Sequence, residues 1–252
     1  MRTAVLIATC LLSAPALAAD GNTHCFTGYG YELESNRFAY TEHHEQMLDD
    51  AGRPVDWTVT YRDPDGEVIA RKTLDFSHNE FVPVYRMRMI DSGYVEGIER
   101  DASGWRMFRR DGENAEHETE PFELTDNLAA DSGFHPFLQS RFDTLMDGET
   151  RHFRFAAAGR QSAFDLQVAR IEDTKFEGET AVRFEAELDM WLVSFFVDSL
   201  VLTYDPHTRE LLEYRGIGNL HDAEGETYPV RVAYYSEPPD EAGDVATSCG
   251  GD

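Results

Sequence analysis

The feature that most constrains the fold is a strict alternation of apolar and polar residues, interrupted repeatedly by tight-turn sequences. Residues 55–61 read Val-Asp-Trp-Thr-Val-Thr-Tyr, and the turn sequence Asp-Pro-Asp-Gly follows at 63–66. In such a turn Pro presets the first central dihedral angle, and Gly supplies the positive φ that closes a hairpin. The return segment, 67–76, alternates again and places on one face Val68, Ala70, Leu74 and Phe76. A two-residue period with short turns predicts antiparallel β-hairpins.

The same pattern recurs along most of the chain. Further alternating segments lie at 94–100, 105–110, 164–172, 180–190, 200–204, 210–217 and 228–235, with turn residues between successive members. We therefore expect a mainly β protein. Its sheet should be a large antiparallel meander, either a curved sheet or a half-barrel, with about ten or more strands.

One segment, 132–146, has helical periodicity instead. Its apolar positions are Phe134, Phe137, Leu138, Phe142 and Leu145. Asp131 or Ser132 can cap its start and Gly148 can end it, which predicts a single amphipathic helix packed on the concave side of the sheet. The later run 191–197 is apolar on both faces and fits either a buried strand or a helical turn.

These two segments together are unusually rich in aromatic residues. A curved sheet around a helix can bury them in a filled core, or can leave an apolar cavity between the layers. For the second case, the candidate lining residues are Phe134, Phe137, Phe142, Trp191, Phe195 and Phe196.

The first residues predict export. Arg2 precedes an apolar run, 4–12, that is too short to span a bilayer, and a small-x-small site predicts cleavage between Ala18 and Ala19. Cys10 lies inside this leader, and the alternative of a lipid-modified cysteine is disfavoured by the Thr that precedes it. We expect a leader at 1–18, one β-rich domain at 19–236 and a polar, flexible tail at 237–252. The mature protein should be periplasmic or secreted, with no transmembrane segment.

Two cysteines, Cys25 and Cys249, follow the leader. In an oxidising compartment such a pair predicts a disulfide, here closing a loop of about 225 residues and contributing at most roughly 5 kcal/mol. A redox-active pair is the alternative, but neither cysteine belongs to a Cys-x-x-Cys motif.

The chain is strongly acidic, with 48 acidic and 22 basic residues and a net charge of −26. Such a charge repels phosphate backbones and anionic membrane surfaces, so nucleic acid is excluded as a partner. Lys72 and Lys175 are the only lysines. An acidic, lysine-poor surface is typical of halophilic adaptation, although an ordinary acidic exported protein has the same composition.

No motif specifies a chemistry. His43, His44, His78 and Glu80 are possible metal ligands in neighbouring pairs, but no His-Glu-x-x-His motif or third ligand accompanies them. We expect these histidines and their acidic neighbours to be solvated on the outer face of the sheet. The chain also lacks a Gly-x-Ser-x-Gly nucleophile elbow. We therefore assign no catalytic residue, metal or cofactor.

The leader, the hairpin series from 26 to 235 and the single Phe-rich helix resemble the architecture of periplasmic half-barrel proteins, of which the lipoprotein carriers LolA and LolB are examples. They are also similar to uncharacterised exported β-rich families of Gram-negative bacteria. The carriers hold acyl chains in a cavity, so the resemblance implies non-enzymatic binding of a lipid or other apolar or amphipathic ligand, or of a cell-envelope partner. This chain is longer, is far more acidic and has no recognisable lid. The alternatives are a secreted hydrolase with a carboxylate pair or a His/Glu metal site, and a structural or interaction module.

Overall fold

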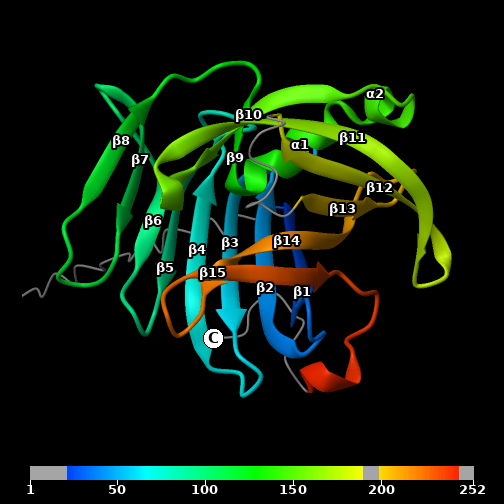
Figure 1. Cartoon of the computed structure of the whole chain (residues 1–252), viewed down its shortest axis with the longest axis horizontal. Helices are drawn as coiled ribbons and strands as arrows, with labels where there is room; N and C mark the ends of the chain where they lie inside the picture. The colour runs from blue at the N-terminus through cyan, green and yellow to red at the C-terminus, as the bar shows by residue number, and fades with distance from the viewer. Residues whose placement is uncertain (1–21, 190–198, 244–252) are drawn as a thin grey trace, which may run out of the picture.

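The structure, a computed structural model, describes residues 22–189 and 199–243. Within these residues fifteen strands form one open, curved sheet (Figure 1). The strands are β1 (Asn22–Glu32), β2 (Phe38–Leu48), β3 (Pro54–Arg62), β4 (Val68–Asp75), β5 (Val84–Met89), β6 (Val95–Asp101), β7 (Gly104–Arg110), β8 (Glu118–Phe122), β9 (Leu128–Ala130), β10 (Arg151–Ala157), β11 (Ser162–Phe176), β12 (Glu179–Leu188), β13 (Leu200–Tyr204), β14 (Leu211–His221) and β15 (Thr227–Ala233). This confirms the predicted mainly β, curved antiparallel sheet.

The first and last strands lie together in the middle of the sheet. β1 pairs with both β2 and β15, and the strand order is β8-β7-β6-β5-β4-β3-β2-β1-β15-β14-β13-β12-β11-β10-β9. We call β1–β8 the N-terminal arm and β9–β15 the C-terminal arm. Each arm is an antiparallel meander, except that β9 joins β10 in parallel.

Curvature brings the two arms face to face. In Figure 1, β14 and β15 run across the front of β2, β3 and β4. The Asn219 side-chain amide donates to the Tyr61 hydroxyl at 3.3 Å, which joins β14 to β3. Near the sheet edges, the Arg109 guanidinium donates to the Gly159 carbonyl at 3.1 Å. The inner faces of the two arms therefore face one another and are joined by hydrogen bonds at these points.

The predicted helix at 132–146 is wrong in one respect, because it is broken into short pieces. A 3₁₀ turn (Asp131–Gly133) leads into α1 (Phe134–Gln139), and α2 (Phe142–Met146) follows after Arg141, which has φ −116° and ψ 8°. The Ser140 hydroxyl and the Arg141 guanidinium both donate to the Phe137 carbonyl, at 2.7 and 3.2 Å. The backbone N–H of Arg141 donates to the Leu138 carbonyl rather than to the Phe137 carbonyl. Side-chain donors thus occupy the Phe137 carbonyl, which in a continuous α-helix would accept the Arg141 N–H.

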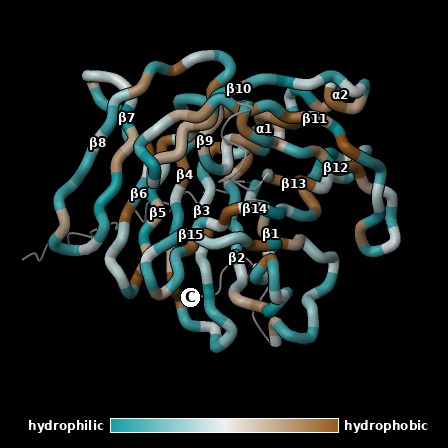
Figure 2. The backbone as a smooth tube through the Cα atoms, in the orientation of Figure 1, coloured by the Kyte–Doolittle hydropathy of each residue, from teal (hydrophilic) through white to brown (hydrophobic). Residues whose placement is uncertain are grey.

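Apolar side chains gather in two main clusters on the inner face. The first lies mainly on β3–β6 and meets β14 and β15, and the second joins α1 and α2 to β10–β13. Figure 2 shows polar and apolar residues alternating along the strands, as a sheet with one buried face requires. A small third cluster lies on β1, where Tyr29 and Tyr31 contact Ala242 of a 3₁₀ turn (Asp240–Ala242) in the predicted tail region.

No helix in the two described ranges has the length and apolar character that crossing a membrane requires.

Candidate binding cavity

A cavity of about 1530 Å³ is lined by residues of both arms and of α1. Small-molecule sites usually measure about 300–1,000 Å³, so this space can hold a long or branched ligand. Its wall is divided by chemistry. The N-terminal arm contributes a cluster of charged and polar side chains, and the C-terminal arm contributes mostly apolar ones.

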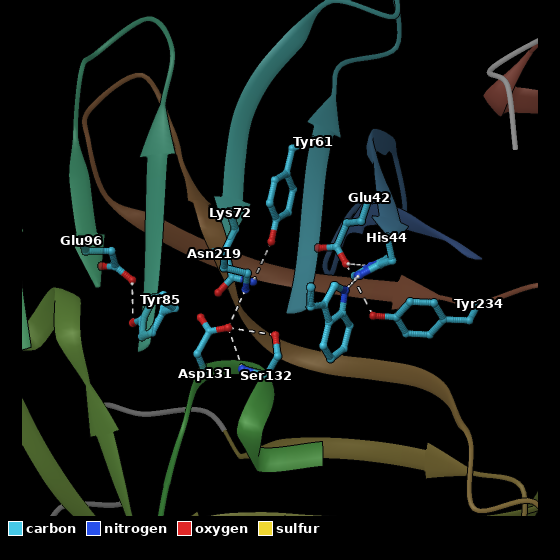
Figure 3. A network of polar contacts seen from close by, with 11 residues as sticks. Glu42, His44, Tyr61, Lys72, Tyr85, Glu96, Asp131, Ser132, Asn219 and Tyr234 are labelled. Carbon is cyan, nitrogen blue, oxygen red and sulfur yellow. Dashed lines mark hydrogen bonds and ion pairs between the residues drawn. The ribbon is translucent and has the colours of Figure 1, made fainter. Parts of the chain in front are cut away.

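Strand register explains how the polar cluster is assembled. Cross-strand pairs join the following residues of β2–β6 into one row: His44, Val59, Lys72, Met87 and Glu96. These five strands are consecutive in the sheet, and side chains that lie directly opposite one another on adjacent strands share a face. The three polar residues, His44, Lys72 and Glu96, therefore lie in a row on the inner face (Figure 3). The two apolar residues between them, Val59 and Met87, are buried.

The first part of the cluster is centred on His44. Its Nε2 lies 3.1 Å from Oε2 of Glu42, and its Nδ1 accepts a hydrogen bond from the Trp57 indole at 3.1 Å. Because an indole N–H can only donate, neutral His44 carries its proton on Nε2 and donates it to Glu42. The Phe26 ring stacks on the imidazole at 4.4 Å. Burial lowers the pKa of His44, and this effect exceeds the opposing effect of the Glu42 hydrogen bond.

The second part is a buried ion pair. Nζ of Lys72 lies 2.8 Å from Oδ1 of Asp131, and the two side chains are only 4% and 6% exposed. The same oxygen accepts the Ser132 amide at 2.6 Å and the Ser132 hydroxyl at 2.8 Å. The pair joins β4 to the turn that enters α1, so it fixes the helix segment against the N-terminal arm (Figure 3).

The third part surrounds Glu96. Its carboxyl group accepts the Tyr94 hydroxyl at 2.7 Å and the Tyr85 hydroxyl at 3.5 Å. Burial raises the pKa of Glu96, because the charged form loses hydration, although both phenols act in the opposite direction. The pKa values of both phenols are also raised, chiefly by burial. Glu96 thus lies in a setting that favours its neutral form.

The facing wall is mainly apolar. It includes Phe134, Phe155, Leu166, Ala186, Leu188 and Leu202. Charged residues such as Arg160, Glu187 and Glu210 also belong to the lining on this side, but they are exposed. His135 at the start of α1 is a further titratable group of this wall, and its Nδ1 lies 3.2 Å from the Tyr204 hydroxyl. Burial lowers the pKa of His135 to about 4, so the ring is neutral near pH 7.

The aromatic residues predicted to line a cavity divide into three groups. Phe134 lies on the cavity wall, whereas Phe137 and Phe142 are buried in the second core cluster. Trp191, Phe195 and Phe196 lie outside the described residues. So do Ala18, Ala19 and Cys249, while Cys25 lies in β1. The predicted disulfide and cleavage site therefore stay predictions.

The prediction that these residues are solvated on the outer face is wrong for Glu42 and His44, because both are buried on the inner face of β2. Glu45, on the opposite face, and His78 and Glu80, after β4, are exposed as expected, and His43 is partly buried. In the described ranges, no three His, Cys, Asp or Glu side chains come together in a way that could hold a metal ion.

The polar cluster had a signal in the sequence. Lys72 shares the face of Val68, Ala70 and Leu74, so a rare lysine interrupts an otherwise apolar strand face. A charged residue at such a position indicates a buried partner or a site. β2 gave no comparable signal, because polar residues occupy both of its faces from 41 to 46.

Comparison with known proteins identified no matching family model, curated protein or solved structure.

Proposed function

We propose that the protein binds an amphipathic ligand, without catalysis, in the cavity between the two arms. The observation that carries the proposal is the two-sided lining of that cavity. One wall presents Glu42, His44, Lys72 and Glu96, and the other presents mainly leucine, phenylalanine and alanine side chains, with its charged residues exposed. A ligand with a polar head and an apolar tail matches both walls at once.

The size of the cavity and simple transfer energetics support this ligand class. Burying a CH₂ group contributes about 0.8 kcal/mol, so a twelve-carbon tail would contribute at most roughly 10 kcal/mol before the costs of ordering and immobilisation. Micromolar affinity needs about 8 kcal/mol. An apolar tail in the C-terminal arm can therefore supply a large part of the gross binding free energy, and contacts of the head with the polar wall must help to offset the cost of immobilisation.

The predicted leader supports a site of action outside the cytoplasm. We propose that the mature protein acts in the periplasm or after secretion, as a carrier or receptor for an envelope-associated amphiphile. The proposed role matches the one that the architectural resemblance to lipoprotein carriers implies.

Native mass spectrometry of gently purified mature protein tests the proposal directly. We expect an additional mass from a bound amphiphile, and after delipidation we expect saturable binding of the neutral probe N-phenyl-1-naphthylamine. A bare polypeptide mass together with no saturable binding of the probe would refute the proposal.

A matched pair of variants locates the binding. Ala186 lines the cavity on β12, whereas Ala169 of β11 points to the opposite face, because its cross-strand partner is Glu185. Ala186→Phe should fill part of the cavity and weaken probe binding, and Ala169→Phe should leave binding unchanged. Thermal unfolding of both variants checks that the fold is retained.

A further inference from the structure

The polar wall of the cavity carries an unbalanced charge. Its buried part contains one cation, Lys72, and three carboxyl groups, those of Glu42, Asp131 and Glu96, whereas Arg109 and Asp111 line a more exposed part of the same wall. Lys72 is held by Asp131 at 2.8 Å. Glu96 accepts hydrogen bonds from two phenol groups, and its burial raises its pKa. The remaining carboxylate, Glu42, has no Lys or Arg partner among the ion pairs of the described residues.

Glu42 is nevertheless only 5% exposed. Its two hydrogen-bond donors are His44, which is neutral, and the Tyr234 hydroxyl at 3.5 Å. Both bonds are made to Oε2, and no donor of the described residues bonds Oε1. A buried carboxylate without a counter-charge costs free energy that an incoming cation would recover.

The surroundings of Glu42 are aromatic. Phe26 lies 6.0 Å from Trp57 and 5.7 Å from Tyr234, measured between ring centroids, and all three line the cavity. Aromatic rings attract cations through their electron-rich faces, and quaternary ammonium groups are typical ligands of such clusters. Carboxylate and rings together thus suit a weakly hydrated cation better than an anion.

Local packing preserves this arrangement. Gly28 of β1 pairs with Glu42 across the strands. A Cβ atom at this position would lie 2.9 Å from the Tyr234 ring and 3.2 Å from Oε2 of Glu42. The glycine allows the tyrosine and the carboxylate to approach each other beside the cavity.

We propose that the ligand carries a cationic ammonium group that docks against Glu42 among Phe26, Trp57 and Tyr234. Its apolar tail extends toward the C-terminal arm. This inference rests on the proposed function, because it names the headgroup class of the amphiphile that the cavity binds.

Three surfactants with the same tail and different heads test the inference. Dodecyltrimethylammonium, dodecyl maltoside and dodecyl sulfate are titrated below their micellar concentrations into delipidated mature protein by calorimetry. The salt concentration is about 0.15 M, where exposed charges are screened beyond about 8 Å. We expect the ammonium compound to bind about 10- to 100-fold more tightly than the maltoside, and the sulfate to bind most weakly.

The key variant is Glu42→Gln, and its matched control is Glu45→Gln. Both residues lie on β2 and both changes remove one negative charge, but Glu45 is exposed on the opposite face. We expect Glu42→Gln to lower the ratio of the ammonium affinity to the maltoside affinity to a value near one. Glu45→Gln should leave both affinities unchanged, which separates a local site from attraction by the acidic surface.

A second measurement on the unmodified protein covers the case in which Glu42→Gln does not fold. The ammonium preference should persist when salt is raised to about 0.5 M, because buried pairs are screened less than exposed charges. Binding of the maltoside without an ammonium preference would overturn this inference and leave the proposed function standing. An ammonium preference that survives Glu42→Gln would also overturn this inference, and so would an ammonium preference that disappears at about 0.5 M salt. Absence of binding by all three surfactants would refute both.

Discussion

The buried pair of Lys72 and Asp131 offers the sharpest test of how the two parts of the fold are joined. Its Nζ–Oδ1 distance is 2.8 Å, and it connects residues that are 59 positions apart in the chain. Lys72→Met keeps the apolar stem of the side chain but leaves the Asp131 carboxylate buried without a cation. Breaking a buried pair in this way costs about 3–5 kcal/mol.

We expect a value near the lower end of that range. Both residues line the cavity, so water can partly solvate the abandoned carboxylate. A domain of this size loses about 2–4 °C in Tm per kcal/mol, so a cost of about 3 kcal/mol corresponds to a fall of roughly 6–12 °C. Urea unfolding followed by far-UV circular dichroism measures the change in free energy of unfolding.

A double variant separates the charge effect from packing. In Lys72→Met with Asp131→Asn, the amide oxygen can still accept the two Ser132 donors, so most of the lost stability should return. The exposed pair of Arg53 and Asp49 is the control, and Arg53→Met should cost far less stability than Lys72→Met. If Lys72→Met costs no more than this control, or if the double variant loses the sum of the two single losses, the reasoning is refuted.

Three further predictions concern stability. Phe184→Ala should reduce the free energy of unfolding by about 3–5 kcal/mol in urea titrations, because the ring is fully buried between Phe142 and Tyr204; a loss below about 1 kcal/mol would contradict the packing described. Gly97→Ala should cost at least about 1–3 kcal/mol, since its Cβ would lie 1.9 Å from the Tyr85 carbonyl oxygen, whereas Gly112→Ala, 3.4 Å from the nearest atom, should be nearly neutral in the same assay. His135 has its pKa lowered from 6.5 to about 4, so the folded state binds fewer protons than the unfolded state between these values. Stability should therefore fall by up to about 3 kcal/mol as the pH drops through this window, and unfolding curves of His135→Gln should lack that part of the fall; an unchanged pH slope would count against the buried neutral ring.

The hairpins could be predicted from the sequence because their signals are local. The predicted strands 55–61 and 67–76 correspond to β3 and β4, and the Asp-Pro-Asp-Gly turn lies between them. Pro and Gly act on dihedral angles within the turn itself, so they need no distant partner. The strand alternation likewise reports the local difference between a buried and a solvated face.

Pairings between distant segments left no such signal. β1 joins β15 across almost the whole described chain, and β9 joins β10 in parallel across the helical segment. The break at Arg141 was also hidden, because the apolar periodicity of 134–145 continues through it. It depends on which donor reaches the Phe137 carbonyl, and this is decided by packing rather than by periodicity.

Only part of the candidate site could be predicted from the sequence, for a related reason. Phe134 is one of the aromatic residues that the sequence offers as cavity lining if the core is not filled, and it lies on the cavity wall. The burial of Glu42 and His44 could not be predicted, because alternation cannot assign a burial face to a strand that is polar on both sides. Their position follows from the register with β3, where they lie opposite Tyr61 and Val59 on the buried face.

The placement of the polar residues argues for a role beyond stability. Well-packed apolar side chains in place of buried charges are often neutral or stabilising, so folding alone gives no reason to keep Glu42, Lys72 and Glu96 on one inner face. Cross-strand pairing brings Lys72 and Glu96 into the row of His44, with Glu42 on the same face, so four polar exceptions to the apolar pattern lie together at one wall of one cavity. Local departures from folding rules concentrate at functional sites. A ligand that satisfies these groups binds only the folded chain, so it should raise the free energy of unfolding in proportion to the logarithm of its concentration. An amphiphile that binds through its tail alone would stabilise the Glu42→Gln variant as strongly as the unmodified protein, which would separate tail binding from the recognition of a head.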